Sequence, residues 1–343
     1  MNINLRLDHL KGVKLDAGWE TTPTMLASLV SKALDVQQLG FRADAATGVI
    51  FAQQLQAMSN RIREKALPQF KGKNLLPMQN EAPFGAEEFA YVVADRVGML
   101  EHITNYADDL PNIEVTGEKM VVNIRAFGGS IIYSVFEIAK ATVAGMNIVD
   151  RKGMAIRNAA EQKLDQIIWV GDAETGLTGL YNAPNVTTRT APNGAAGSSS
   201  TWATKTAEEI YADLVYPITQ QATDTLGAER PDTVVMTSAS YERARTTFFT
   251  DNTGENAMER FKKSYPEITV ETVEWLGPKG TGQTNSAMIH YRNDSEKLGV
   301  EVPKPFTMMP PEARNLATVV DGYLATAGVV VYFPLSVTVT NGI

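Results

Sequence analysis

Cysteine is absent from the 343 residues of this chain. Because disulfides and thiolate metal sites both need cysteine, neither stabilises the protein, and a thiol nucleophile is excluded. Histidine is almost as scarce, since only His9, His102 and His290 occur and none has a second ligand at helical spacing. The sequence therefore gives no support for a zinc site, and stability must come from packing and association.

Long apolar runs and an excess of positive charge are also missing. No stretch approaches the roughly 18 consecutive apolar residues of a membrane span, and residues 1–23 alternate in polarity instead of forming the apolar core of a secretion signal. The formal net charge of -8 argues against tight nucleic-acid binding, which depends on lysine and arginine. We expect a chain that is made and used in a cytoplasm and has no membrane partner.

One glycine-rich stretch, GDAETGLTGLYN at residues 171–182, needs a decision between two interpretations. Gly171, Gly176 and Thr178 have the spacing of a phosphate-binding P-loop. In that motif a lysine reaches the β and γ phosphates, and Leu177 stands in its place without a charge. The stretch also follows an apolar-periodic segment, where a glycine is first of all a helix C-cap. We interpret it as a structural turn.

Other candidate sites have equally plain explanations. Adjacent acidic residues occur three times, at Glu87 and Glu88, Asp108 and Asp109, and Glu208 and Glu209. Neighbouring strand residues point to opposite faces and no third ligand is visible, so we interpret these pairs as solvated surface. The glycines of residues 277–282 have the wrong order for a dinucleotide fingerprint and predict a turn. The sequence thus predicts no catalytic residue, no metal and no cofactor.

The first part of the chain predicts an arm followed by a long hairpin. The first sixty or so residues carry few bulky apolar groups, apart from a short amphipathic stretch after Pro23. Strands are predicted at residues 74–78, 87–100, 101–115 and 118–134, with turn residues at Asp109, Pro111, Asn112, Thr116 and Gly117. A hairpin with so many charged positions is not the centre of a core, and its edges need partners.

From residue 134 to residue 170 the pattern changes to helix. Ser134 is a candidate N-cap, and Glu137 stands at the position of the acid in a capping box. Apolar residues recur along one face, at Ile156, Ala160, Leu164 and Ile168. Gly145 and Gly153 each weaken the helix by roughly 1 kcal/mol relative to alanine, so a bend or break is expected in the middle.

The rest of the chain alternates helix and strand and ends in strands. Residues 191–201 predict a polar loop, and residues 205–300 an α/β layer with its own core. Helices are predicted at 207–227 and 240–249, and strands at 232–236, 268–276 and 286–292. The last forty residues return to strands, with strict alternation from Ser336 to Thr340, while Pro334 predicts an edge or a bulge.

This order of elements resembles the major capsid proteins of tailed bacteriophages with the Hong Kong 97-type fold, over roughly residues 41–343. The resemblance implies an α+β fold with an N-terminal arm at 1–66, an extended loop and flanking strands at 67–133, a spine helix and following loop at 134–204, an axial domain at 205–300, and closing strands of the peripheral domain at 301–343. In such proteins a glycine motif makes the turn after the spine helix. Its residues here are Gly171, Asp172, Gly176, Leu177, Gly179, Leu180 and Asn182.

The resemblance implies a head protein that self-assembles as hexamers and pentamers into the icosahedral shell around a double-stranded DNA genome. The extended loop, about residues 80–122, would lie over a neighbouring subunit and contact it near Asp108, Asp109 and Pro111. The segment at residues 310–315 would be a turn near threefold contacts. The implied partners are further copies of the chain, a separate scaffold protein, a portal, a decoration protein and non-specifically contacted DNA, in a virion assembled in the bacterial cytoplasm.

Two alternatives stay open at this point. An encapsulin-like nanocompartment would keep the fold and hold a cargo enzyme instead of DNA. A soluble α/β enzyme that uses residues 205–300 as a substrate domain would form a small discrete oligomer, and it would leave the arm and the hairpin without a purpose.

Overall fold

The computed structural model describes residues 69–97, 114–145, 147–195, 197, 199–251 and 254–343. The predicted arm at 1–66 lies outside the described residues, as do Asp108, Asp109 and Pro111 of the predicted inter-subunit loop. The chain divides into two units, Met1–Leu67 and Pro68–Ile343. The fold set out below is that of the second unit.

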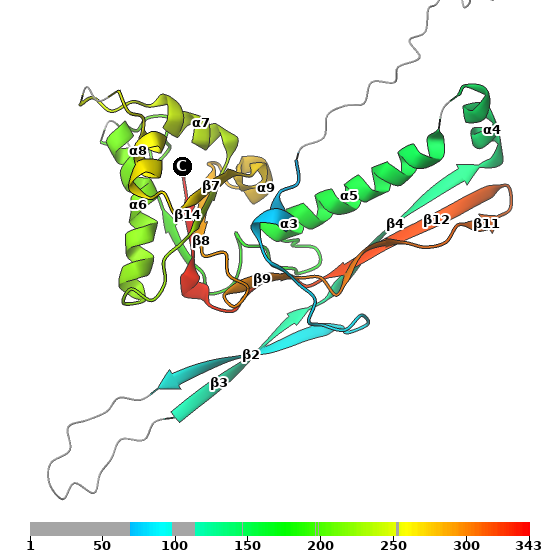
Figure 1. Ribbon diagram of the computed structural model, residues 1–343, viewed down its shortest axis with the longest axis horizontal. Helices are drawn as coiled ribbons and strands as arrows, with labels where there is room; N and C mark the ends of the chain where they lie inside the picture. The colour runs from blue at the N-terminus through cyan, green and yellow to red at the C-terminus, as the bar shows by residue number, and fades with distance from the viewer. Residues whose placement is uncertain (1–68, 98–113, 146, 196, 198, 252–253) are drawn as a thin grey trace, which may run out of the picture. The chain divides into compact units, whose positions relative to one another are not determined.

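The predicted hairpin is present as strands β2 (Glu88–Val97) and β3 (Glu114–Asn123), which pair antiparallel along their whole length (Figure 1). Neither strand pairs with any other strand among the described residues. The single strand predicted over 118–134 is divided at Ile124, a buried residue whose N–H donates to the Glu87 carbonyl at 2.8 Å. Beyond it, β4 (Arg125–Ser134) joins a different sheet.

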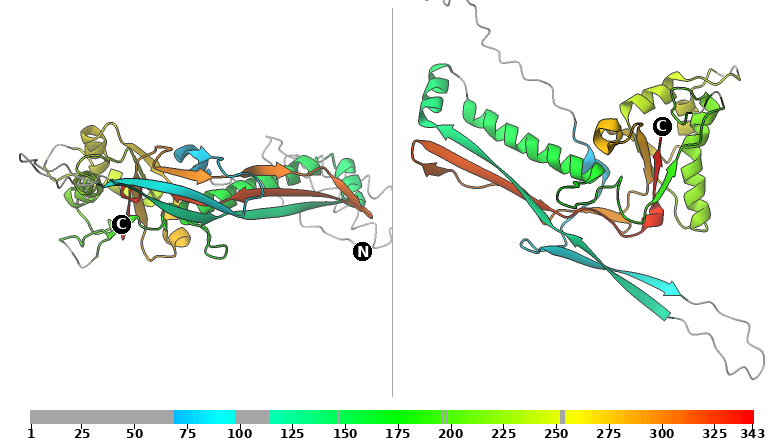
Figure 2. Two further views of the ribbon diagram at one scale, coloured as in Figure 1. Left: turned by 90° about the horizontal axis from the view of Figure 1, so that it is seen from below. Right: turned by 180° about the vertical axis from the view of Figure 1, so that it is seen from behind.

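A second sheet forms around β12 (Ala317–Thr326), which pairs with β4 over ten residues. The other edge of β12 pairs with β10 (Lys304–Met308) and β11 (Glu312–Arg314). Helix α5 (Ile148–Val170) runs along this sheet (Figure 1 and the right view of Figure 2), and its residues Ile148 and Ile156 pack against Ile131 and Tyr133 of β4. The segment 312–314, predicted within a turn, is therefore a short strand.

The single helix predicted from 134 to 170 is two helices. The first, α4 (Val135–Val143), ends before Gly145, whose φ of 68° is not helical. The second, α5, begins after Asn147, whose side-chain oxygen accepts a hydrogen bond from the Asp150 N–H. Gly153 lies inside α5 without interrupting it, so the expected break occurs at only one of the two glycines.

A five-stranded sheet forms the core of the α/β layer, in the order β5 (Thr187–Thr190), β14 (Val337–Asn341), β8 (Ala287–Tyr291), β6 (Thr233–Met236) and β7 (Thr269–Thr272). Three helices supply one of its apolar clusters, namely α6 (Ala207–Asp224), α7 (Ser238–Thr246) and α8 (Ala257–Ser264). Val234 and Met236 of β6 pack in this cluster, while Val235 packs in a second cluster with the last turns of α5. The sheet is thus buried on both faces, and α8 is a helix that the sequence did not predict.

Strand β14 lies within residues 301–343, the segment predicted as closing strands of the peripheral domain. It lies between β5 and β8 in the five-stranded sheet. Val337 and Val339 pack in the cluster with α5, while the Thr338 hydroxyl accepts a hydrogen bond from Gln221 of α6 at 2.8 Å. Valine and threonine therefore alternate along β14 because its valines face the α5 side of the sheet and its threonines face the α6 side, both of which are buried.

A three-stranded sheet of β1 (Met78–Gln79), β9 (Leu298–Glu301) and β13 (Gly328–Val331) joins these layers. Four short helical turns complete the described part, namely α3 (Gly72–Leu75), η2 (Glu274–Leu276), α9 (Pro278–Thr281) and η3 (Pro334–Ser336). The strand predicted at 74–78 is thus mostly α3 and its exit, and the turn predicted at 277–282 contains α9. Among the described residues, none of the helices combines the length and the hydrophobicity that a membrane crossing requires.

Candidate interaction surfaces

The glycine motif forms a tight turn at the end of α5. Gly171 ends the helix with φ 77° and ψ -166°, a conformation that is essentially restricted to glycine. Gly179 passes so close that a Cβ added to it would lie 2.3 Å from the Gly171 nitrogen. The Gly179 N–H donates to Asn182 Oδ1 at 2.7 Å, and the side chains of Leu177 and Leu180 are buried.

Backbone hydrogen bonds within the same turn hold it against α5. The Asp172 and Leu177 backbones exchange hydrogen bonds at 2.9 and 3.1 Å, and the Leu180 N–H donates to the Ile168 carbonyl at 2.8 Å. Burial alone would raise the pKa of Asp172, but hydrogen bonds from Thr175 and Lys163 together lower it. The P-loop interpretation fails on charge, because the buried Leu177 stands where the lysine would be.

The predicted cap of the long helix differs from the observed one. Ser134 stands at the N-cap of α4, but its side chain makes no capping hydrogen bond. The Val135 N–H instead donates to the Leu316 carbonyl at 3.0 Å. Glu137 forms an ion pair with Lys152 of α5 at 2.8 Å, and the hydrogen bond from Lys152 lowers the pKa of Glu137. These two contacts attach α4 to its neighbours.

Buried acids in the described residues serve the fold. Asp165 of α5 accepts hydrogen bonds from the Gly72 N–H at 2.7 Å and from Trp275 Nε1 at 2.8 Å. Burial raises the pKa of Asp165. Glu301 of β9, which is fully buried, accepts hydrogen bonds from the backbones of Glu81 and Ala82 at 2.8 and 2.9 Å. Asp165 thus connects α3 and η2 to α5, and Glu301 connects residues 81–82 to β9.

A buried ion pair and a buried histidine hold α6 in place. Lys205 Nζ lies 2.5 Å from Asp213 Oδ2, which also accepts a hydrogen bond from Trp202 Nε1 at 2.9 Å. His290 Nε2 lies 3.1 Å from the Leu214 carbonyl, and burial lowers the pKa of His290 to about 3. A neutral imidazole therefore donates a hydrogen bond to α6 about one turn before Pro217. Separately, the described residues contain no group of three acids or histidines able to hold a metal.

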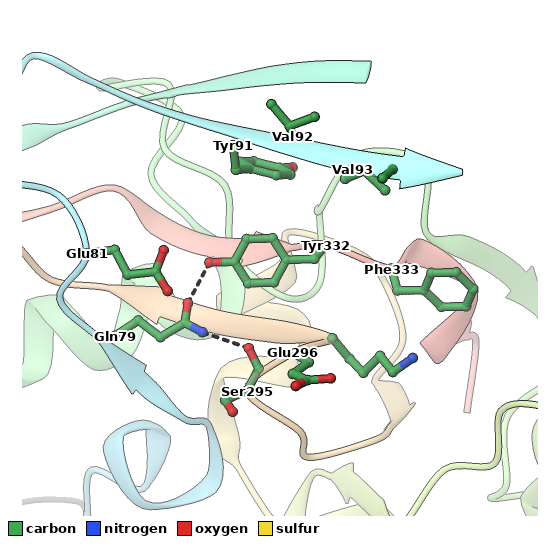
Figure 3. A pocket seen from close by; sticks show the side chains of 11 residues that line it. Gln79, Glu81, Tyr91, Val92, Val93, Ser295, Glu296, Tyr332 and Phe333 are labelled. Atoms are coloured by element: carbon green, nitrogen blue, oxygen red, sulfur yellow. Dashed lines mark hydrogen bonds between the residues drawn. The ribbon is translucent and has the colours of Figure 1, made fainter. Parts of the chain in front are cut away.

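A cleft of about 700 Å³ lies beside the base of the hairpin (Figure 3). The Tyr332 hydroxyl donates to Gln79 Oε1 at 2.6 Å, and Gln79 Nε2 donates to the Ser295 carbonyl at 2.7 Å. The rings of Tyr91 and Tyr332 meet edge to face at 5.0 Å, and burial together with nearby Glu81 raises the pKa of Tyr332. The Tyr332 hydroxyl thus stays protonated as a structural donor. Its hydrogen bond to Gln79 of β1 and its ring contact with Tyr91 of β2 connect these two strands to the end of β13.

Helix α4 exposes much of its apolar surface. Phe136 is 65% exposed and Val143 is 92% exposed, and they lie two helical turns apart on the same side, with Ala139 between them. Only Ala141 of this helix is buried. Further exposed apolar side chains surround the start of the helix, namely Ile132, Val135 and Leu316. We call these six residues, Ile132, Val135, Phe136, Ala139, Val143 and Leu316, the α4 patch.

The sequence did not single out the α4 patch, although the spacing of Phe136, Ala139 and Val143 was available as a signal. The hairpin adds apolar surface of its own, since Val92 of β2 and Val121 of β3 are 67% and 50% exposed. Contiguous exposed apolar surface of this kind is typical of protein interaction sites. The described part of the chain thus has surfaces suited to binding other proteins and lacks a recognisable reaction centre.

Comparison with known proteins identifies the family. A family model described as major capsid protein matches residues 98–343. No curated protein sequence matches the chain. Among solved structures, the capsid of Myoviridae phage XM1 is 18% identical and superposes with a TM-score of 0.74, covering 85% of this chain and 98% of that one.

Other solved structures give the same fold at lower similarity. A chain from Mycobacterium phage Bobi is 14% identical with a TM-score of 0.59, covering 88% of this chain and 100% of its own. The capsid of the native GTA particle is 11% identical with a TM-score of 0.60, covering 87% and 99%. The α+β, Hong Kong 97-type fold expected from the order of elements is confirmed by these likenesses, and with the family match over most of its length the chain belongs to the major capsid protein family.

Proposed function

We propose that this chain is the head protein of a tailed bacteriophage, which self-assembles as hexamers and pentamers into the icosahedral shell around a double-stranded DNA genome. Family membership supports the structural role, and phage capsids with the same fold support the setting. The observation that carries the proposal is the α4 patch, because a single chain leaves it in water. A closed, symmetric assembly repeats such a contact in every copy.

The α4 patch can supply a large part of the attraction between copies. Complete burial of a valine or phenylalanine side chain is worth about 1.5–3 kcal/mol, and Phe136 and Val143 are mostly exposed. The chain carries a net charge of -8, so copies repel one another at long range. Apolar contacts are the interaction that can overcome this repulsion without pairing charges.

The hairpin is the second proposed contact. Strands β2 and β3 pair only with each other among the described residues, so each has an outer edge that can bind another chain. We propose that the hairpin lies on a neighbouring subunit, with Asp108, Asp109 and Pro111 at that contact. The hydrogen bond between Val135 and Leu316 joins α4 to the turn after β11, so residues 310–315, which we propose near threefold contacts, precede a turn that is attached to α4.

The remaining partners follow from the same proposal. A separate scaffold protein, a portal and a decoration protein are the further proposed partners of a shell that assembles in the host cytoplasm. Packaged DNA would be contacted weakly and non-specifically, because the acidic residues of a subunit with a net charge of -8 outnumber the basic residues that neutralise phosphates. The buried acids Asp165 and Glu301 accept hydrogen bonds within the fold, which agrees with a structural role for them instead of a catalytic one.

The decisive experiment is negative-stain electron microscopy of the purified chain, with absorbance at 260 and 280 nm on the same fraction. We expect closed shells, or rings of five and six subunits. Replacing Phe136→Ser and Val143→Ser together removes the centre of the α4 patch at exposed positions, where substitutions change folding stability by only about 0.5 kcal/mol. This variant should fold and fail to assemble, while Lys140→Ala on the same helix should assemble normally.

Two results would contradict the proposal. A monodisperse monomer or dimer across salt and concentration would refute the shell role and return attention to a small enzyme. Shells that contain a protein cargo and no nucleic acid, when produced in the natural host, would identify a nanocompartment instead of a virus head.

A further inference from the structure

The turn after α6 places a leucine in an unusual backbone conformation. The helix ends at Asp224, and Leu226 follows with φ 52°, next to Gly227 with φ 84°. The Gly227 N–H donates to the Ala222 carbonyl at 2.6 Å, which closes the helix. Glycine or asparagine adopts the left-handed conformation at this position with much less strain than leucine.

The side chain of Leu226 is unfavourably placed as well. It is 97% exposed, more than any other large apolar side chain in the described part of the chain. The isolated subunit therefore bears two unfavourable terms at one residue, namely backbone strain and a leucine in water. Strain of this kind is typical of positions that serve a function.

Contacts of the neighbouring residues Thr225 and Glu229 hold the turn that carries Leu226 in place. Glu229 is buried and forms ion pairs with Lys297 at 2.7 Å and Arg292 at 3.4 Å. The Glu229 N–H donates to Thr225 Oγ1 at 3.0 Å. The backbone of the turn is thus held in place, so it loses little conformational entropy when a partner covers the leucine.

The surroundings favour a second copy of the chain as that partner. Residues 225–228 carry no formal charge, and η3, which contacts α6, carries Leu335 at 41% exposure. Because each copy has a net charge of -8, two copies approach most easily where neutral apolar groups meet. We propose that Leu226 is an anchor residue of a contact between copies, where it inserts into an apolar site on the neighbouring subunit. This inference rests on the proposed self-assembly and names a contact outside the α4 patch and the hairpin.

The test separates folding from assembly. Leu226→Gly and Leu226→Asn both relieve the backbone strain and remove the apolar side chain, so the melting temperature of the unassembled subunit should rise by roughly 2 °C. The lowest protein concentration that gives shells, measured by light scattering, should rise about tenfold, since burial of a leucine is worth about one factor of ten or more. Leu226→Met keeps the strain and the apolar side chain and should match the wild type in both assays.

The outcomes are distinct. A higher melting temperature with unchanged assembly in the glycine and asparagine variants would overturn the inference and leave the proposed function intact. Loss of assembly in the methionine variant as large as in the glycine variant would also overturn it. Failure of the wild type to assemble would overturn both the inference and the proposed function.

Discussion

Replacing Gly179 by alanine should be among the most damaging single changes in this chain. The added Cβ would lie 2.3 Å from the Gly171 nitrogen, 2.7 Å from the Ile167 oxygen and 2.7 Å from the Val170 carbonyl carbon. All three neighbours are backbone atoms at the end of α5, so no side chain can move aside. Relief requires the turn to separate from the helix.

The magnitude follows from what that separation removes. Overpacking alone typically costs about 1–3 kcal/mol. The hydrogen bonds from Gly179 to Asn182 and from Leu180 to Ile168 would be strained as well, at about 1 kcal/mol each. We expect a loss of about 3–5 kcal/mol, a large share of the roughly 5–15 kcal/mol by which a typical domain is stable.

Gly153→Ala is the matched control, because it is the same substitution inside α5. A Cβ at Gly153 has no other atom within 4 Å, and the helical backbone there suits alanine. This variant should gain about 0.5–1 kcal/mol. The assay is urea unfolding of the unassembled subunit, followed by tryptophan fluorescence, to which the buried Trp169 and Trp202 contribute, with midpoints compared at equal slope. Stabilities of the two variants within about 1 kcal/mol of each other would refute the close packing described for the turn.

Two further predictions concern α6. His290 has a folded-state pKa of about 3, below its value in the unfolded chain, so its stabilising contribution is complete above pH 6.5 and is lost as the pH falls toward 3. Between pH 6.5 and pH 3, the free energy of unfolding of the wild type should fall by roughly 1 kcal/mol per pH unit more than that of His290→Gln. Parallel curves of unfolding free energy against pH would contradict a buried, neutral His290. Lys205→Met, at a position that is 1% exposed, leaves the Asp213 carboxylate without its nearest cation and should cost about 3 kcal/mol in urea unfolding at pH 7. Adding Asp213→Asn should recover part of that loss, and a Lys205→Met variant as stable as wild type would show that the pair does not hold α6.

Local signals predicted the elements whose formation depends on near neighbours. The hairpin of β2 and β3 was predicted because alternation and turn residues act within a few positions. The break near Gly145 was anticipated for the same reason, since glycine weakens any helix. Which of the two glycines interrupts the helix could not be predicted, because Asn147 caps a new helix only where β4 and α5 pack together.

Long-range pairing decided what the sequence could not predict. The chain remains extended through Ile124, and the division into β3 and β4 arises because β4 pairs with β12, nearly two hundred residues later. The sheet to which β14 belongs is likewise determined by its pairing with β5 and β8, which lie far away in the sequence. The α4 patch was missed because a helical apolar stripe is normally interpreted as buried, and exposure appears only when the rest of the fold is known.

The short connection between β3 and β4 links the two proposed contact regions within one subunit. Ile124 alone separates the strands, and it packs with Phe89, Ala327 and Val330 at the base of the hairpin. A neighbour that holds the hairpin therefore restrains β4, which is paired over ten residues with β12 and leads directly into α4. Because continuous paired strands transmit displacement between distant contacts, binding at the hairpin should favour one orientation of the α4 patch. Cooperative assembly is thus expected from the backbone connection itself.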